Sequence, residues 1–195
     1  VHDAGDIGAC IRECLERALS MARENPDVYV PQQFENEANV EVHKLQTARE
    51  ILEQAETPIH GFCSGIGTGG TITGVGEVLK GANPDIEIWA VEPENAALLS
   101  GGSIGTHLQM GIGDGIIPPI LNREIYSRIV TVTDEEAIGT AKDLAKKEGL
   151  MCGISAGTNV AAALRMAKEL GEGKTVVTIL PDTAERYFST ELFAD

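Results

Sequence analysis

Basic side chains are scarce in this sequence, because 15 lysines and arginines stand against 30 aspartates and glutamates and leave a net charge of −15. Such a charge repels phosphate backbones, so we expect no nucleic-acid partner. Long apolar runs are missing too, and none approaches the ~20 residues of a membrane span. No charged-then-apolar leader marks the start, so we expect neither a membrane anchor nor a secretory signal in the sequence as it stands.

Paired cysteines are also missing. The four cysteines form no CxxC pair, although Cys10 and Cys14 lie one helical turn apart. We expect all four, with Cys63 and Cys152, to be small buried apolar residues. This usage excludes a disulfide scaffold and favours a reducing cytoplasm. We predict no metal site.

Strands and helices alternate along the 195 residues, a length sufficient for one full domain with its own core. Thr133 and Glu136 form a capping box that fixes one helix start. The alternation predicts an α/β fold with a mostly parallel sheet flanked by helices, and ligands beyond the carboxyl ends of the strands. We expect helices over 7–23, 37–55, 71–81, 134–148 and 156–170, and strands over 28–30, 58–63, 86–91, 127–132 and 175–180.

A glycine- and threonine-rich run over 64–76 follows one of these strands and opens a helix. This geometry directs backbone N–H groups and the positive helix end at a phosphate, and Thr68 and Thr71 add hydroxyl donors. Three interpretations stay open. The first is the dinucleotide fingerprint Gly65-x-Gly67-x-x-Gly70, with Glu92 as the carboxylate that binds the ribose. The second is a cup for the phosphate of a smaller cofactor, and the third is a turn that only packs a helix on a sheet.

Other candidate positions have equally plain structural explanations. The glycine-rich loop from Ser100 to Pro119 either brings bare backbone against a flat ligand or is a flexible surface loop. Ser155 opens a predicted helix and could serve only as its cap. His43 is expected to be a surface or packing residue of an amphipathic helix.

Five motifs together resemble the cysteine synthase (O-acetylserine sulfhydrylase) and cystathionine β-synthase family, pyridoxal-phosphate enzymes of the tryptophan-synthase-β fold type. The motifs are Gln32-Gln33-Phe34, Gly65–Thr71, Gln109–Gly113, Gly153–Gly157 and Leu180–Tyr187. The resemblance implies pyridoxal 5′-phosphate as the cofactor and a reaction in which O-acetylserine and sulfide give cysteine and acetate. It implies phosphate contacts from the cup, a hydrogen bond from Ser155 to the pyridine nitrogen, Pro181 near the ring, a backbone contact at Gly111, and a substrate site at Gln33 and Phe34. The implied phosphate contacts are Gly67, Thr68, Gly69, Gly70 and Thr71.

The sequence departs from the family because the lysine that holds the cofactor is not recognisable among its seven lysines. The chain resembles the family from about a third of the way in. We therefore expect residues 1–36 to be a βα remnant of the smaller N-terminal domain, residues 37–195 to be the cofactor domain, and the chain alone to be inactive. The family further implies a homodimer and binding of the serine acetyltransferase C-terminal tail. A cystathionine β-synthase-type enzyme and an NAD(P)-binding Rossmann domain are the alternatives.

Overall fold

A four-stranded parallel sheet forms the centre of the molecule in a computed structural model that describes residues 7–194. The strands are β1 (Ile59–Gly65), β2 (Glu87–Pro93), β3 (Arg128–Val132) and β4 (Thr175–Thr178), in the order β3-β2-β1-β4. Every pair of neighbours is parallel, which confirms the predicted fold class.

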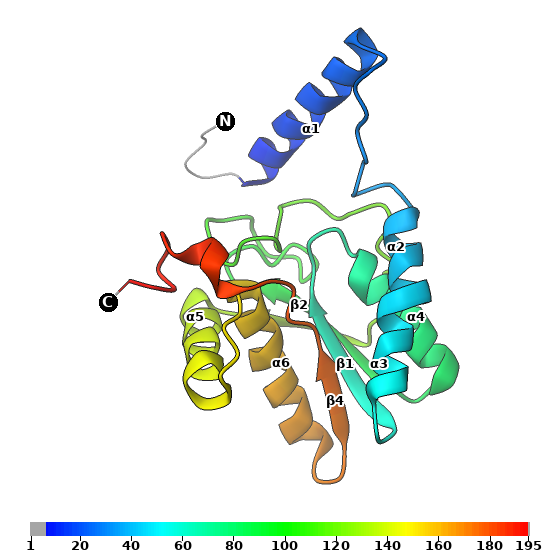
Figure 1. The fold of residues 1–195 in the computed structure, drawn as a ribbon, viewed down its shortest axis with the longest axis vertical. Coiled ribbons are helices and arrows are strands. Elements are labelled where there is room, and N and C mark those ends of the chain that lie inside the picture. The colour runs from blue at the N-terminus through cyan, green and yellow to red at the C-terminus, as the bar shows by residue number, and fades with distance from the viewer. Residues whose placement is uncertain (1–6, 195) are drawn as a thin grey trace.

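Helices cover both faces of this sheet. In Figure 1, α5 and α6 lie on one side, and α2, α3 and α4 lie on the other, while α1 stands above the strands. No helix within residues 7–194 is long and apolar enough to cross a bilayer. The helices are α1 (Ile7–Glu24), α2 (Ala38–Val42), α3 (Ala48–Gln54), α4 (Gly70–Ala82), α5 (Asp134–Asp143) and α6 (Ile154–Leu170), with π-helical turns η1 (His43–Thr47) and η2 (Leu144–Glu148) and a 3-10 turn η3 (Ala184–Tyr187).

Alternating residues of the strands build two cores, one on each face. Cys63 and Trp89 pack with Met166 of α6, whereas Phe62 and Ile88 belong to the cluster beside α4. Successive side chains of a strand point to opposite faces, so a strand buried on both sides reads as a continuous apolar run. Burial raises the pKa of the Cys63 thiol to about 11, which keeps it protonated.

Two expectations about the N-terminal part are wrong. No strand forms over 28–30, because these residues have no neighbouring strand to pair with among the described residues, and Tyr29 is 80% exposed. The expected burial of all four cysteines also fails, since Cys14 is exposed and Cys10 half-buried on α1. The long helix predicted over 37–55 is present, with η1 as a π turn in its middle.

The carboxyl ends of β1 and β4 separate, and this opens the crevice where the site lies. The pairing of β1 with β4 ends at Cys63↔Thr178, whereas β1 stays paired with β2 as far as Gly65↔Val91. From β1 the chain turns into α4 on one face, and α6 leads into β4 on the other. Ligands of open α/β sheets bind at such a reversal of strand order.

Two glycines of α4 provide a test of its packing. A Cβ on Gly74 would lie 2.5 Å from the Val40 carbonyl oxygen, whereas a Cβ on Gly81 would meet nothing within 4 Å. We expect Gly74→Ala to lower the free energy of unfolding by about 1–3 kcal/mol, because the neighbouring backbone must move. Gly81→Ala should instead raise it by up to about 1 kcal/mol through helix propensity. Urea unfolding measures both, and equal effects would contradict the close contact at Gly74.

Candidate functional site

The turn after β1 leaves the N-terminus of α4 uncapped. Gly69 precedes the helix with φ +79°, a conformation suited to glycine, and no side chain caps the helix. The N–H groups of the first turn therefore lack helical partners, and those other than Gly70 N are available to an anion. Thr68 Oγ1 accepts a hydrogen bond from Gly70 N at 3.3 Å.

Bare backbone closes one side of this turn. A Cβ on Gly67 would lie 2.4 Å from the Gly111 carbonyl oxygen, so only glycine fits here without a shift. Gly113 N donates to Ile66 O at 2.9 Å and holds the two loops together. The predicted phosphate turn and the predicted glycine loop thus meet at one place.

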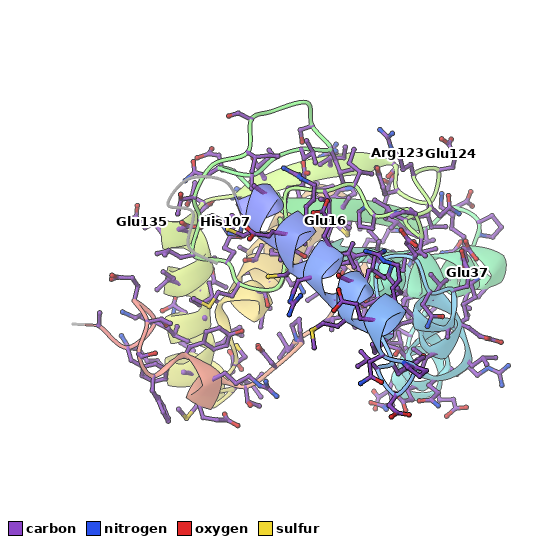
Figure 2. All side chains as sticks on the ribbon, turned by 90° about the horizontal axis from the view of Figure 1, so that it is seen from above. Glu16, Glu37, His107, Arg123, Glu124 and Glu135 are labelled. Carbon is purple, nitrogen blue, oxygen red and sulfur yellow. The ribbon has the colours of Figure 1, made fainter. Side chains whose placement is uncertain are left out.

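Gln109 fixes the glycine loop and decides between its two interpretations. Its side chain is 0% exposed, and its amide donates to Val132 O and to Asp134 Oδ1, both at 2.9 Å. Its carbonyl oxygen accepts from Thr158 Oγ1 at 2.8 Å. His107 lies in the same loop beside the start of α5, where Glu135 is labelled (Figure 2). This stretch is therefore not a free surface loop.

The start of α6 and the end of β4 supply the opposite elements of the site. Ser155 is the second residue of α6 and 4% exposed, and Gly153, not Ser155, occupies the N-cap position. The expectation of a mere cap is therefore wrong. Within the described part of the chain the Ser155 hydroxyl has no hydrogen-bond partner, so it is available to a ligand. Gly153 N donates to Asp182 O at 3.1 Å, which brings Pro181 and Asp182 beside this helix end.

Asn159 spans the crevice between β1 and β4. Its Oδ1 accepts from Gly65 N at 2.7 Å, and its Nδ2 donates to Ile179 O at 2.8 Å. It is 2% exposed and was not a predicted site residue. A buried asparagine between two parting strands gives no local sequence signal, because its partners lie 94 and 20 residues away.

These elements enclose one pocket of about 590 Å³, a size typical of small-molecule sites. All predicted site residues except Gly70 line it. Gly70 lies behind the cup, where a Cβ would meet Asn39 Oδ1 at 2.2 Å. Ile11 of α1 also lines the pocket, in keeping with the view in Figure 2, where α1 crosses this edge of the sheet. The lining residues predicted from the sequence are Gln33, Phe34, Gly67, Thr68, Gly69, Thr71, Gly111, Ser155 and Pro181.

Glu92 is not a ligand-binding carboxylate. It is 4% exposed and lies outside the pocket lining. Its oxygens accept from Leu99 N at 2.6 Å and from the backbone and hydroxyl of Ser100 at 3.1 and 2.8 Å. The carboxylate closes the loop after β2, so the expected ribose contact of a dinucleotide site is wrong.

Two titratable side chains of the pocket were missed in the sequence. Burial raises the pKa of the Asp114 carboxyl, and nearby His107 only partly opposes the shift. Burial, with a hydrogen bond to Asp182, raises the pKa of Tyr187 to about 12. Among residues 7–194 no lysine lines the pocket, and Lys44 pairs with Glu77 at 2.5 Å on the helices behind it.

Comparison with known proteins accounts for this arrangement. Residues 1–182 match the family model described as pyridoxal-phosphate dependent enzyme. The chain belongs to the pyridoxal-phosphate dependent enzyme family. The uncapped N-terminus of α4, the hydroxyls of Thr68 and Thr71, and the hydroxyl of Ser155 all face one pocket.

Relatives within this family confirm the resemblance to the cysteine synthases. A cysteine synthase of Staphylococcus aureus is 49% identical over 186 residues, which are 93% of this chain and 60% of that protein. A solved cysteine synthase of Entamoeba histolytica superposes with a TM-score of 0.87 at 40% identity, over 92% of this chain and 53% of that one. An O-acetylserine-dependent cystathionine β-synthase of Helicobacter pylori gives 0.88 and 39%, over 92% and 58%. The chain thus spans less than two thirds of the length of each.

The raised pKa of Asp114 predicts a pH-dependent stability. Burial favours the protonated carboxyl in the folded protein, so its ionisation weakens folding as the pH rises through the folded pKa. Asp114→Asn cannot ionise and should have a larger free energy of unfolding than the parent at pH 8. The gain should shrink as the pH approaches the ordinary aspartate pKa of about 3.9.

Urea unfolding at several pH values measures this gain. Asp143→Asn is the matched control, because Lys147 lowers the pKa of Asp143 at the surface, so no gain is expected there at pH 8. A gain for Asp114→Asn that is the same at every pH would show that the charge is not its source.

Proposed function

We propose that this chain binds pyridoxal 5′-phosphate and contributes to β-replacement of the cysteine synthase kind, in which O-acetylserine and sulfide give cysteine and acetate. The observation that carries the proposal is the uncapped N-terminus of α4, which opens with Thr68 and Thr71 into the same pocket as the Ser155 hydroxyl. The 49% identity to a cysteine synthase supports the choice of reaction. When bound, the cofactor supplies an electron sink for elimination and addition at the β-carbon.

The residues of the chain would bind and orient the reactants. Gly67, Thr68, Gly69 and Thr71 would hold the phosphate through backbone N–H groups and hydroxyls. The Ser155 hydroxyl would donate a hydrogen bond to the ring nitrogen. Because this partner is neutral, the nitrogen would stay unprotonated, which suits elimination better than transamination. Pro181 packs at the ring, and Gly111 offers its backbone. Gln33 and Phe34 face the substrate.

The alternatives are less well supported. A Rossmann oxidoreductase domain needs a carboxylate at the ribose, and Glu92 is fully engaged in a loop. A cystathionine β-synthase-type reaction is less well supported, because the cysteine synthase of Staphylococcus aureus is 49% identical and the cystathionine β-synthase of Helicobacter pylori 39%.

Domain division and partners follow from the resemblance. We infer a boundary at residues 36 and 37, where the chain passes from α1 and an extended segment into α2 and the layered body (Figure 1). We also infer a homodimer, an amino-acid substrate, binding of the serine acetyltransferase tail and a cytoplasmic location. The four free cysteines support a reducing compartment.

Binding of pyridoxine 5′-phosphate tests the cofactor site. This compound has the ring and phosphate of the cofactor and no aldehyde, so its binding measures the affinity of the pocket and not a reaction with surface lysines. Calorimetry should show saturable binding that is at least about tenfold tighter than for pyridoxine. Gly67→Ala should remove most of the binding, because its Cβ would lie 2.4 Å from the Gly111 oxygen.

Gly139→Ala is the control for this substitution, because a Cβ on Gly139 of α5 meets nothing within 4 Å. Equal affinities for pyridoxine and its phosphate would contradict the phosphate cup. Borohydride reduction with pyridoxal phosphate should give no stoichiometric adduct by intact mass, because none of the described residues that line the pocket is a lysine. A single modified lysine would contradict that arrangement.

A further inference from the structure

A second layer of side chains lies directly behind the phosphate cup. The helix formed by α2 and η1 packs on α4, where Gly70 and Gly74 lie one turn apart and leave no room for a Cβ. A Cβ on Gly70 would meet Asn39, and one on Gly74 would lie 2.7 Å from His43 Cβ. Asn39 and His43 are likewise one turn apart, so Gly70 leaves space for the side chain of Asn39 and Gly74 leaves space for that of His43.

Asn39 contacts the first threonine of the cup. Its Nδ2 donates to Thr68 Oγ1 at 2.9 Å, and Gly70 N donates to the same oxygen at 3.3 Å. A hydroxyl oxygen that accepts two hydrogen bonds still has its own proton to donate. Among the described residues this proton has no acceptor, and Thr68 lines the pocket. The Thr68 hydroxyl is thereby set as a donor toward a ligand.

His43 contacts the second threonine in a corresponding way. Its Nε2 lies 3.2 Å from Thr71 Oγ1, and its Nδ1 lies 2.9 Å from Thr47 Oγ1. Burial lowers the pKa of His43, which favours the neutral ring with one proton at neutral pH. His43 packs against Gly74, in keeping with the expected packing role, and its ring also contacts two threonine hydroxyls.

A neutral ring allows two arrangements of hydrogen bonds. In one, Thr47 donates to Nδ1, Nε2–H donates to Thr71, and the Thr71 proton is free to point into the pocket. In the other, Nδ1–H donates to Thr47 and Thr71 donates to Nε2, so its lone pairs face the pocket. An anion in the cup requires donors and selects the first arrangement.

Cationic side chains do not take the place of these threonine hydroxyls at the cup in the described structure. Lys44, next to His43, is paired with Glu77 of α4 at 2.5 Å and lies outside the pocket lining. Arg186 is the basic residue among the lining residues, and it lies on η3 beyond β4. The phosphate is therefore held by dipoles, and the direction of each hydroxyl matters more than it would beside a cation.

We propose that His43 is a positioning residue which, oriented by Thr47, turns the Thr71 hydroxyl toward the phosphate of the cofactor, as Asn39 does for Thr68. The proposal rests on the proposed cofactor site. The π turn η1 begins at His43, and π turns are frequent at functional sites because the extra residue changes which side chains share a face.

Calorimetry with pyridoxine 5′-phosphate tests the proposal on substituted forms of the chain. His43→Leu removes the donor and should weaken binding about tenfold, the effect of one hydrogen bond to a charged group. His43→Gln offers an amide N–H near the position of Nε2 and should stay within about threefold of the parent. Affinity for pyridoxine, which has no phosphate, should not change. In a Thr71→Val background His43→Leu should cause no further loss.

Each alternative outcome has a distinct meaning. Equal weakening of pyridoxine and its phosphate, or additive losses in the Thr71→Val background, would reduce His43 to a packing residue and overturn the proposal. Unchanged binding by His43→Leu would also overturn it. If the unsubstituted chain does not bind pyridoxine 5′-phosphate, the proposed cofactor site itself fails.

A second measurement needs no substitution. The nitrogen chemical shifts of the His43 ring in the unsubstituted protein should show a protonated Nε2 and a bare Nδ1 when pyridoxine 5′-phosphate is bound. A proton on Nδ1 with a bare Nε2 would contradict the proposal directly.

Discussion

The separation of β1 and β4 after the Cys63↔Thr178 pair is the constraint on which the site depends. Two parallel strands that stay paired to their ends leave no space between them, whereas these strands part and their following loops turn to opposite faces. Asn159 bonds to both sides and keeps the gap at a fixed width. The cup on one side and the Pro181 segment on the other are thereby held at a distance set by one buried amide.

The parts of the structure that follow local rules could be predicted from the sequence. The capping box at Thr133 and Glu136 begins α5 as expected, because both partners lie within one turn. The segment over 28–30 has strand-forming residues, but a strand also needs a neighbour, and none is present in the described structure. Gln109 and Asn159 could not be predicted, because their roles exist only once distant segments meet. Glu92 was misjudged because a carboxylate at a strand end serves a turn as well as a ligand.

The phosphate site that we propose in a chain of net charge −15 would rely on local dipoles instead of cations. Two acidic side chains line the pocket: burial raises the pKa of the Asp114 carboxyl, and Asp182 Oδ2 accepts a hydrogen bond from the Tyr187 hydroxyl. Since dipoles act at short range, the geometry of the cup decides its affinity, and the close packing of α4 on α2 becomes part of the binding site. A fold feature with no direct ligand contact thereby contributes to recognition.

The amide group of Asn39 has two protons, and both are used. One donates to Thr68 Oγ1 in the cup, and the other donates at 2.9 Å to the backbone oxygen of Gln33, in the segment that we propose as the substrate site. The two sites therefore share one rigid group. If a ligand at Gln33 strengthens or weakens that bond, the binding free energy of a phosphate in the cup changes by a coupling free energy. Thermodynamic reciprocity then requires a bound phosphate to change the binding free energy of the ligand at Gln33 by the same amount. Binding of the cofactor and binding of the substrate would then each change the affinity for the other before any reaction between them.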